Sequence, residues 1–163
     1  MVYGQELDLK YEALAATEEQ LRLIHRNKTG ALINAAVQMG AAAAGATPQQ
    51  CKILASYAYG LGLVFQIVDD VLDVTSTPEQ LGKPIGSDSE NGKTTFVTLY
   101  GTDGAMVLAQ KLNEQICNDL QQHFGAKAAF CSSWLSSFWC AKTKEKGIQI
   151  CSLFKISYQP IRS

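Results

Sequence analysis

The stretch that decides the fold is LVFQIVDDVLDVTSTPEQLGKPIGSD, residues 63–88. In a helix its polar residues would fall at i, i+3, i+4 and i+7 and form one stripe on an otherwise apolar segment: Gln66, Asp69, Asp70 and Asp73. Carboxylates one turn apart repel, and burying them unpaired is costly, so a solvated acidic face is the disfavoured alternative. Mg²⁺ prefers carboxylate oxygens that it shares with phosphates and water. The stripe therefore predicts a magnesium–diphosphate site with the three aspartates as metal ligands.

Helix start and stop signals divide the first 125 residues and predict no strand. The sequence Thr-Glu-Glu-Gln at 17–20 matches a capping box and predicts the start of a helix over 17–44. Within this helix, Gly40 is expected to pack closely against a neighbour. Thr-Pro-Gln-Gln opens a second helix, expected over 47–74. A short helix over 94–100, closed by a glycine, and a longer one over 103–124 complete the set. The predicted fold class is all-α.

Length and composition describe an ordinary globular chain. The 163 residues allow one domain with its own core, and the net charge of −1 argues against a nucleic-acid partner or an anionic membrane surface. The N-terminal residues lack the pattern of a signal peptide, and no uninterrupted apolar stretch approaches the roughly 20 residues of a membrane span. The five cysteines form no CxxC pair, so neither a zinc site nor a disulfide framework is indicated, and a cytoplasmic location is expected.

The last part of the chain differs from the rest. Residues 131–163 hold five basic and one acidic residue, a net charge of +4, whereas residues 1–130 hold nine basic and fourteen acidic residues, a net charge of −5. Both tryptophans and three of the five cysteines also lie in this segment. We expect a divergent tail over 126–163, of the kind that a shifted reading frame or a spliced-on end produces.

Two further segments could supply positive charge to a phosphate. Lys28-Thr29-Gly30 makes a polar notch in mid-helix, where a glycine costs about 1 kcal/mol relative to alanine and so indicates a packing or ligand role. The glycine-rich loop 81–88 carries Lys83, although such a loop alone is more simply a surface turn with a solvated lysine. His25 has no acid or nucleophile partner in the sequence, and we expect it at the surface or an interface.

Taken together, these motifs resemble a known family. Their order and spacing over residues 1–125 are similar to those of the trans-isoprenyl diphosphate synthases, most of all the bacterial farnesyl and geranylgeranyl diphosphate synthases. The motifs that carry the resemblance are Gly4-Gln5-x-x-Asp8-Leu9, Lys28-Thr29-Gly30, Phe65-Gln66-x-x-Asp69-Asp70-x-x-Asp73, Gly82-Lys83-Pro84-x-Gly86-x-Asp88 and Gly92-Lys93-Thr94.

The resemblance implies a function and a set of roles. It implies that residues 1–125 form the C-terminal half of the isoprenoid synthase α-helical bundle, with the tail outside it. The implied reaction is a prenyl transfer that condenses an allylic diphosphate with isopentenyl diphosphate, with Mg²⁺ helping the allylic diphosphate to ionise. A homodimer is an assembly that the resemblance allows. The implied site residues are Asp69, Asp70 and Asp73 for the metal, Lys28, Thr29, Gln66 and Lys83 for catalysis, and Gln5, Lys28, Thr29, Gln66, Lys83 and Lys93 for substrate binding.

The sequence also departs from this family. The family's first aspartate-rich motif and its basic segment for isopentenyl diphosphate belong upstream of Gln5, and no such residues are present. We therefore expect little or no synthase activity from this chain alone. Two alternatives stay open: a non-catalytic helical subunit of an intact synthase, and a related terpene cyclase or squalene/phytoene synthase. The complete second aspartate motif disfavours the first, and the Lys28-Thr29 pair with the Gly82-Lys83-Pro84 loop disfavours the second.

Overall fold

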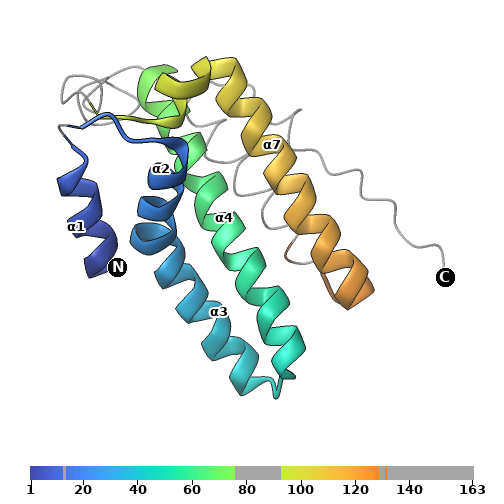
Figure 1. Ribbon diagram of the computed structural model, residues 1–163. Helices are drawn as coiled ribbons and strands as arrows, with labels where there is room; N and C mark the ends of the chain where they lie inside the picture. Colours follow the sequence, from blue (N-terminus) through green and yellow to red (C-terminus); the bar gives the residue numbers. More distant parts are fainter. Residues whose placement is uncertain (13, 76–92, 129–130, 132–163) are drawn as a thin grey trace.

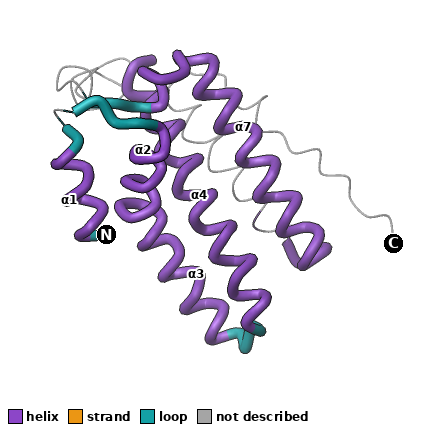
Figure 2. The backbone as a smooth tube through the Cα atoms, viewed as in Figure 1, coloured by secondary structure: helices purple, strands orange, loops and turns teal. Residues whose placement is uncertain are grey.

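The computed structural model describes residues 1–12, 14–75, 93–128 and 131. These residues form helices joined by short loops, with no strand among them, so the all-α prediction is confirmed (Figure 2). The predicted loop 81–88, with Lys83, and the tail from residue 132 lie outside the described residues. The elements are α1 (Val2–Lys10), α2 (Glu18–His25), the π-helical turn η1 (Arg26–Gly30), α3 (Ala31–Ala43), α4 (Pro48–Thr75), α7 (Phe96–Phe124) and the 3₁₀ turn η2 (Gly125–Ala128).

The long helix α4 is the centre of the fold. It packs mainly against α7 and next against α3, and Figure 1 shows both neighbours running antiparallel to it, with α1 beside α2 at the outer edge. Side chains from α4 and α7 supply most of the core, and the large ones that are fully buried include Val64, Ile67, Leu72, Phe96 and Leu120. The polar stripe of α4 is therefore carried by the helix with the most extensive packing.

The helix starts follow from the capping signals in the sequence. The Thr17 hydroxyl accepts a hydrogen bond from the Gln20 backbone N–H at 3.3 Å, and the Gln20 side chain accepts one from the Thr17 N–H at 2.9 Å. Thr47 and Gln50 repeat this reciprocal arrangement ahead of α4, at 3.3 and 2.8 Å. Each pair satisfies two backbone donors that the first helical turn leaves without partners. Both predicted starts are confirmed.

The predicted break between 100 and 103 is also present. Gly101 has φ 69° and ψ 170°, which divides α7 into a short and a long helical piece. A side chain at this φ would clash with the backbone, whereas glycine adopts it readily. We expect Gly40 to pack closely, but a Cβ built on it meets no atom within 4 Å among the residues that the structure describes.

The expectation of one continuous helix over 17–44 is wrong at its middle. Residues 26–30 form a π-helical turn that separates α2 from α3. The backbone is crowded on both sides of this turn. A Cβ on Gly4 of α1 would lie 2.2 Å from the backbone nitrogen of Lys28, and a Cβ on Gly62 of α4 would lie 2.9 Å from the Gly30 Cα. Wide turns of this kind often mark functional sites, and this one contains the predicted Lys28-Thr29 pair.

By length and composition alone, α4 is apolar enough to cross a membrane. The central helix of a water-soluble bundle has the same properties, so one such helix is weak evidence for a span. α4 packs against α7 and α3, and its C-terminal part carries three aspartates.

Candidate functional site

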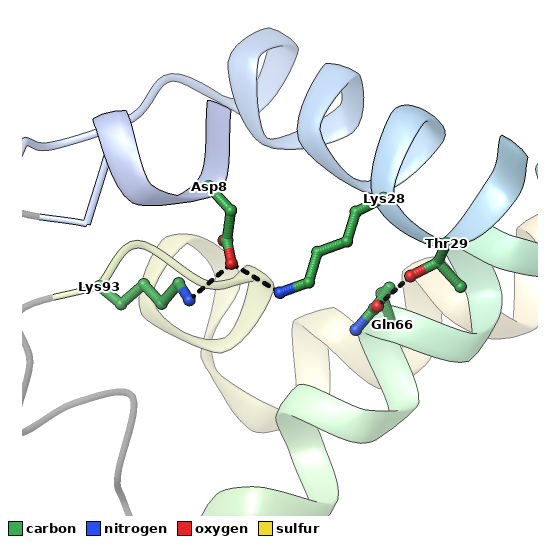
Figure 3. Close-up of polar contacts among 5 residues, drawn as sticks. All are labelled: Asp8, Lys28, Thr29, Gln66 and Lys93. Carbon is green, nitrogen blue, oxygen red and sulfur yellow. Dashed lines mark hydrogen bonds and ion pairs between the residues drawn. The ribbon is translucent and has the colours of Figure 1, made fainter. Parts of the chain in front are cut away.

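Two lysines converge on one carboxylate at the top of the bundle. Lys28 Nζ of η1 lies 2.6 Å from Asp8 Oδ2 of α1, and Lys93 Nζ, from the segment leading into α7, lies 3.0 Å from the same oxygen. Figure 3 shows the two ammonium groups approaching Asp8 from opposite sides. The Asp8 side chain is 8% exposed, whereas those of Lys28 and Lys93 are 34% and 21% exposed. The anion is thus on the inside and the two cations reach solvent.

The two lysines determine the ionisation of Asp8. Burial acts to raise the pKa of this carboxyl, but the hydrogen bonds from Lys28 and Lys93, with their positive charges, together outweigh burial and hold the pKa below its usual value. Asp8 is therefore a stable anion at neutral pH. The sequence predicts no role for Asp8, although it belongs to the Gly4-Gln5-x-x-Asp8 motif, and this motif is the signal that could have identified it.

The next residue on η1 faces a different helix. The Thr29 hydroxyl donates a hydrogen bond to the side-chain carbonyl of Gln66 on α4 (Figure 3). Consecutive residues of the π turn therefore contact two elements: Lys28 contacts α1 and Thr29 contacts α4. Four predicted site residues, Lys28, Thr29, Gln66 and Lys93, lie in this one region.

An apolar groove opens beside this cluster. Its volume is about 590 Å³, and it is lined by residues of α1, η1 and the start of α3: Met1, Val2, Gln5, Lys28, Thr29, Leu32 and Ile33. Most of its surface is apolar, while the predicted polar residues Gln5, Lys28 and Thr29 provide its hydrogen-bonding groups. The groove can accept a molecule with an apolar tail and a negatively charged head.

The three aspartates of α4 occupy different surroundings. Asp70 is buried, and its Oδ2 accepts a hydrogen bond from the Phe96 backbone N–H at 2.9 Å, which fixes the start of α7. Asp73 is buried and Asp69 is half-buried, and both make further interactions. Within the described residues, no three His, Cys, Asp or Glu side chains gather closely enough to hold a metal ion by themselves. Asp69, Asp70 and Asp73 all stay predicted metal ligands, and Asp70 also holds the start of α7 through one of its carboxylate oxygens.

His25 lies in the interior, whereas the sequence predicts a residue at the surface or an interface. Its side chain stacks on the Phe96 ring, with 5.8 Å between centroids and 29° between planes. Neither ring nitrogen has a hydrogen-bond partner among the described residues. Burial lowers the pKa of His25 to about 4. The positive charges of Lys28 and Lys93 also lower this pKa, whereas the negative charges of Asp8 and Asp69 raise it. The imidazole is neutral at pH 7.

Comparisons with known proteins agree with this geometry. The sequence model of the polyprenyl synthetase family matches residues 1–131. Geranylgeranyl pyrophosphate synthase 9 of Arabidopsis thaliana, a chloroplastic protein, is 41% identical over 132 residues, which cover 79% of this chain and 37% of that protein. Farnesyl diphosphate synthase of Geobacillus stearothermophilus is 43% identical over 105 residues, covering 64% of this chain and 35% of the enzyme.

Solved structures give the same relationship. A Helicobacter pylori geranyltransferase, crystallised with magnesium and isoprenyl diphosphate, superposes with a TM-score of 0.74 at 33% identity, over 86% of this chain and 47% of the enzyme. The chain thus spans less than half the length of each of these proteins. The family match covers most of the chain and extends beyond the boundary predicted at residue 125. This chain belongs to the polyprenyl synthetase family.

Proposed function

We propose that this chain forms the diphosphate-binding part of a prenyltransferase that condenses an allylic diphosphate with isopentenyl diphosphate. The observation that carries the proposal is the groove of about 590 Å³, which is lined by apolar side chains together with Gln5, Lys28 and Thr29. Its two kinds of lining match the two parts of an isoprenoid diphosphate, an apolar tail and a multiply charged head. The second lysine, Lys93, binds the same Asp8 oxygen as Lys28 and so lies close to this lining residue of the groove.

The residues have separate tasks in this proposal. Lys28 and Lys93 bind the diphosphate and stabilise the charge that develops as it departs, and Lys83 is proposed for the same task from sequence. The Thr29–Gln66 hydrogen bond holds both side chains in one orientation, and Thr29 also lines the groove. Gln5 lines the same groove. The apolar residues of the groove exclude water, which protects an allylic cation from hydrolysis.

The aspartates of α4 fit a magnesium ion. Mg²⁺ usually binds through one or two protein carboxylates and completes its shell with substrate phosphates and water. Asp69 and Asp73, one helical turn apart, are the residues proposed to hold it, and Asp70 supports them by anchoring α7. Bound magnesium would supply charge neutralisation for the diphosphate leaving group. A cytoplasmic location and a homodimer stay predictions.

The magnesium assignment predicts a specific loss of binding. Asp69→Ala should weaken the binding of inorganic pyrophosphate in the presence of Mg²⁺ by about tenfold or more, because one of two carboxylate ligands is removed. Isothermal titration calorimetry of the purified chain measures this directly. Asp119→Ala, at an exposed position of α7, is the matched control and should bind as the unchanged chain does. Equal affinities of the Asp69→Ala variant and the unchanged chain would refute the role of Asp69.

The chain alone is expected to show little or no condensation. Its residues correspond to less than half the length of the related enzymes, so most of an active site shared with the remainder of such an enzyme is not supplied by this polypeptide. A radiolabelled condensation assay with allylic diphosphate, isopentenyl diphosphate and Mg²⁺ tests this, with an intact farnesyl diphosphate synthase as positive control. Turnover comparable to that of the intact enzyme would contradict the expectation.

A non-catalytic subunit is the second candidate function. It is the alternative that the sequence leaves open beside a prenyltransferase. In that case the chain should form a stable complex with an intact synthase and change its product length or rate. Size-exclusion chromatography with a product assay distinguishes this outcome from diphosphate binding alone.

A further inference from the structure

The cluster around Asp8 joins two like charges that would otherwise separate. Lys28 and Lys93 are 65 positions apart in sequence, yet both ammonium groups lie within 3.0 Å of Asp8 Oδ2. Two ammonium groups this close repel each other, and long lysine side chains have many alternative rotamers in which to move apart. The shared carboxylate offsets that repulsion.

We propose that Asp8 is a positioning residue that keeps Lys28 and Lys93 at one point, ready for a diphosphate. The identity of the ligand rests on the proposed function, whereas the hold on the two lysines is a property of the free chain.

The position of Asp8 suits it for this purpose. Its helix, α1, packs at Gly4 directly against the Lys28 backbone, so the carboxylate has a fixed origin relative to η1. The carboxylate is buried, while the two lysine side chains are 34% and 21% exposed. An anion arriving from solvent therefore meets the lysines first, with Asp8 behind them.

The proposal predicts an effect of Asp8→Asn on diphosphate affinity that is opposite in sign to the effect expected from charge repulsion alone. A negative charge near a diphosphate repels it, so removing the charge of Asp8 should strengthen binding if Asp8 only contributed to the local potential. If Asp8 positions the lysines, Asp8→Asn should weaken binding, because the two ammonium groups separate and must be reordered by the ligand.

The first experiment measures lysine reactivity in the free chain. Acetylation by an N-hydroxysuccinimide ester, followed by mass spectrometry, should be slower at Lys28 and Lys93 than at the exposed Lys52 and Lys111. Asp8→Asn should accelerate acetylation of Lys28 and Lys93 by about threefold or more, since the ion pairs that hold both amines against the buried carboxylate are lost. Asp8→Glu should keep most of the protection.

The result that overturns the proposal is equally clear. If Lys28 and Lys93 react as fast as Lys52 in the unchanged chain, Asp8 does not hold them. The same conclusion follows if Asp8→Asn leaves both rates unchanged. The measurement on the unchanged chain decides even if the Asp8→Asn variant folds poorly, which circular dichroism would reveal.

The second experiment titrates inorganic pyrophosphate by calorimetry. Asp8→Asn should bind about fivefold more weakly, the size expected for loss of partly exposed charge pairs, while Asp8→Glu and the exposed control Asp119→Asn stay close to the unchanged chain. Tighter binding by Asp8→Asn would overturn the positioning role. Failure of the unchanged chain to bind pyrophosphate would count against the proposed function instead, and the acetylation rates would then decide the role of Asp8.

Discussion

Phe96→Ala should lower the free energy of unfolding by about 3–5 kcal/mol, the loss expected when a fully buried aromatic side chain is truncated. Phe96 has no exposed surface and is the first residue of α7. Its ring stacks on His25, and the Arg22 guanidinium lies 5.9 Å from its centroid. Removing the ring leaves a cavity where α2, α4 and α7 meet, while the backbone hydrogen bond to Asp70 is retained.

Urea unfolding followed by circular dichroism measures this loss, at protein concentrations where light scattering shows no association. Leu99→Ala, three positions further along α7, is the matched control because Leu99 is 40% exposed. Its expected cost is below about 1 kcal/mol. Equal losses for the two variants would contradict the prediction, because the buried Phe96 ring would then contribute no more to stability than the exposed Leu99 side chain.

Stability should fall by about 3 kcal/mol as the pH drops from 6.5 to 4, because His25 is neutral in the folded chain and becomes protonated on unfolding. The folded pKa of about 4 lies below the ordinary value of 6.5, so the unfolded state binds more protons in this interval. The free energy of unfolding therefore rises with pH between these values and levels off above them. The depressed pKa of Asp8 acts in a different interval, since its contribution is lost only below the usual carboxyl value of 3.8.

Urea midpoints between pH 4 and 7.5 test the assignment. His25→Leu should remove most of the slope, because the side chain that gains a proton on unfolding is gone. His123, the other histidine of the chain, is exposed on α7, and His123→Leu should leave the slope in place. A slope that persists in His25→Leu would assign the pH dependence to other groups.

Those parts of the fold that depend on residues close together in the sequence could be predicted from the sequence. The starts at Thr17 and Thr47 and the break at Gly101 are local, because each depends on groups within three or four positions. The family resemblance and the all-α class were predicted for a related reason, since the motifs and helical periods are written in consecutive residues.

The parts that depend on distant residues could not be predicted. His25 is buried because Phe96, 71 positions later, stacks on it, and no local pattern contains that partner. The π turn coincides with close backbone approaches at Gly4 and Gly62, from two other helices. Gly40 is a glycine for which the sequence predicts a close neighbour. Among the described residues, no atom lies within 4 Å of a Cβ built there.

For the acidic residues too, the sequence predicts the positions, whereas contacts with distant residues determine the roles. The stripe on α4 was predicted from its spacing, but the task of Asp70 depends on a backbone donor 26 positions away at Phe96. Asp8 was visible only as part of a motif, because its two partners lie 20 and 85 positions further along the chain. Spacing reveals which residues can share a helix face, and tertiary contacts decide which of them meet.

The 85-position separation of Asp8 and Lys93 has a consequence for how the molecule is made. Contacts between such distant residues close late in folding, after helices and their hairpins have formed. The contact between Asp8 and Lys93 should thus form after the individual helices. If the chain binds pyrophosphate as proposed, a refolding chain should regain its helical signal before that affinity, and a nascent chain should gain the affinity only once Lys93 has left the ribosome.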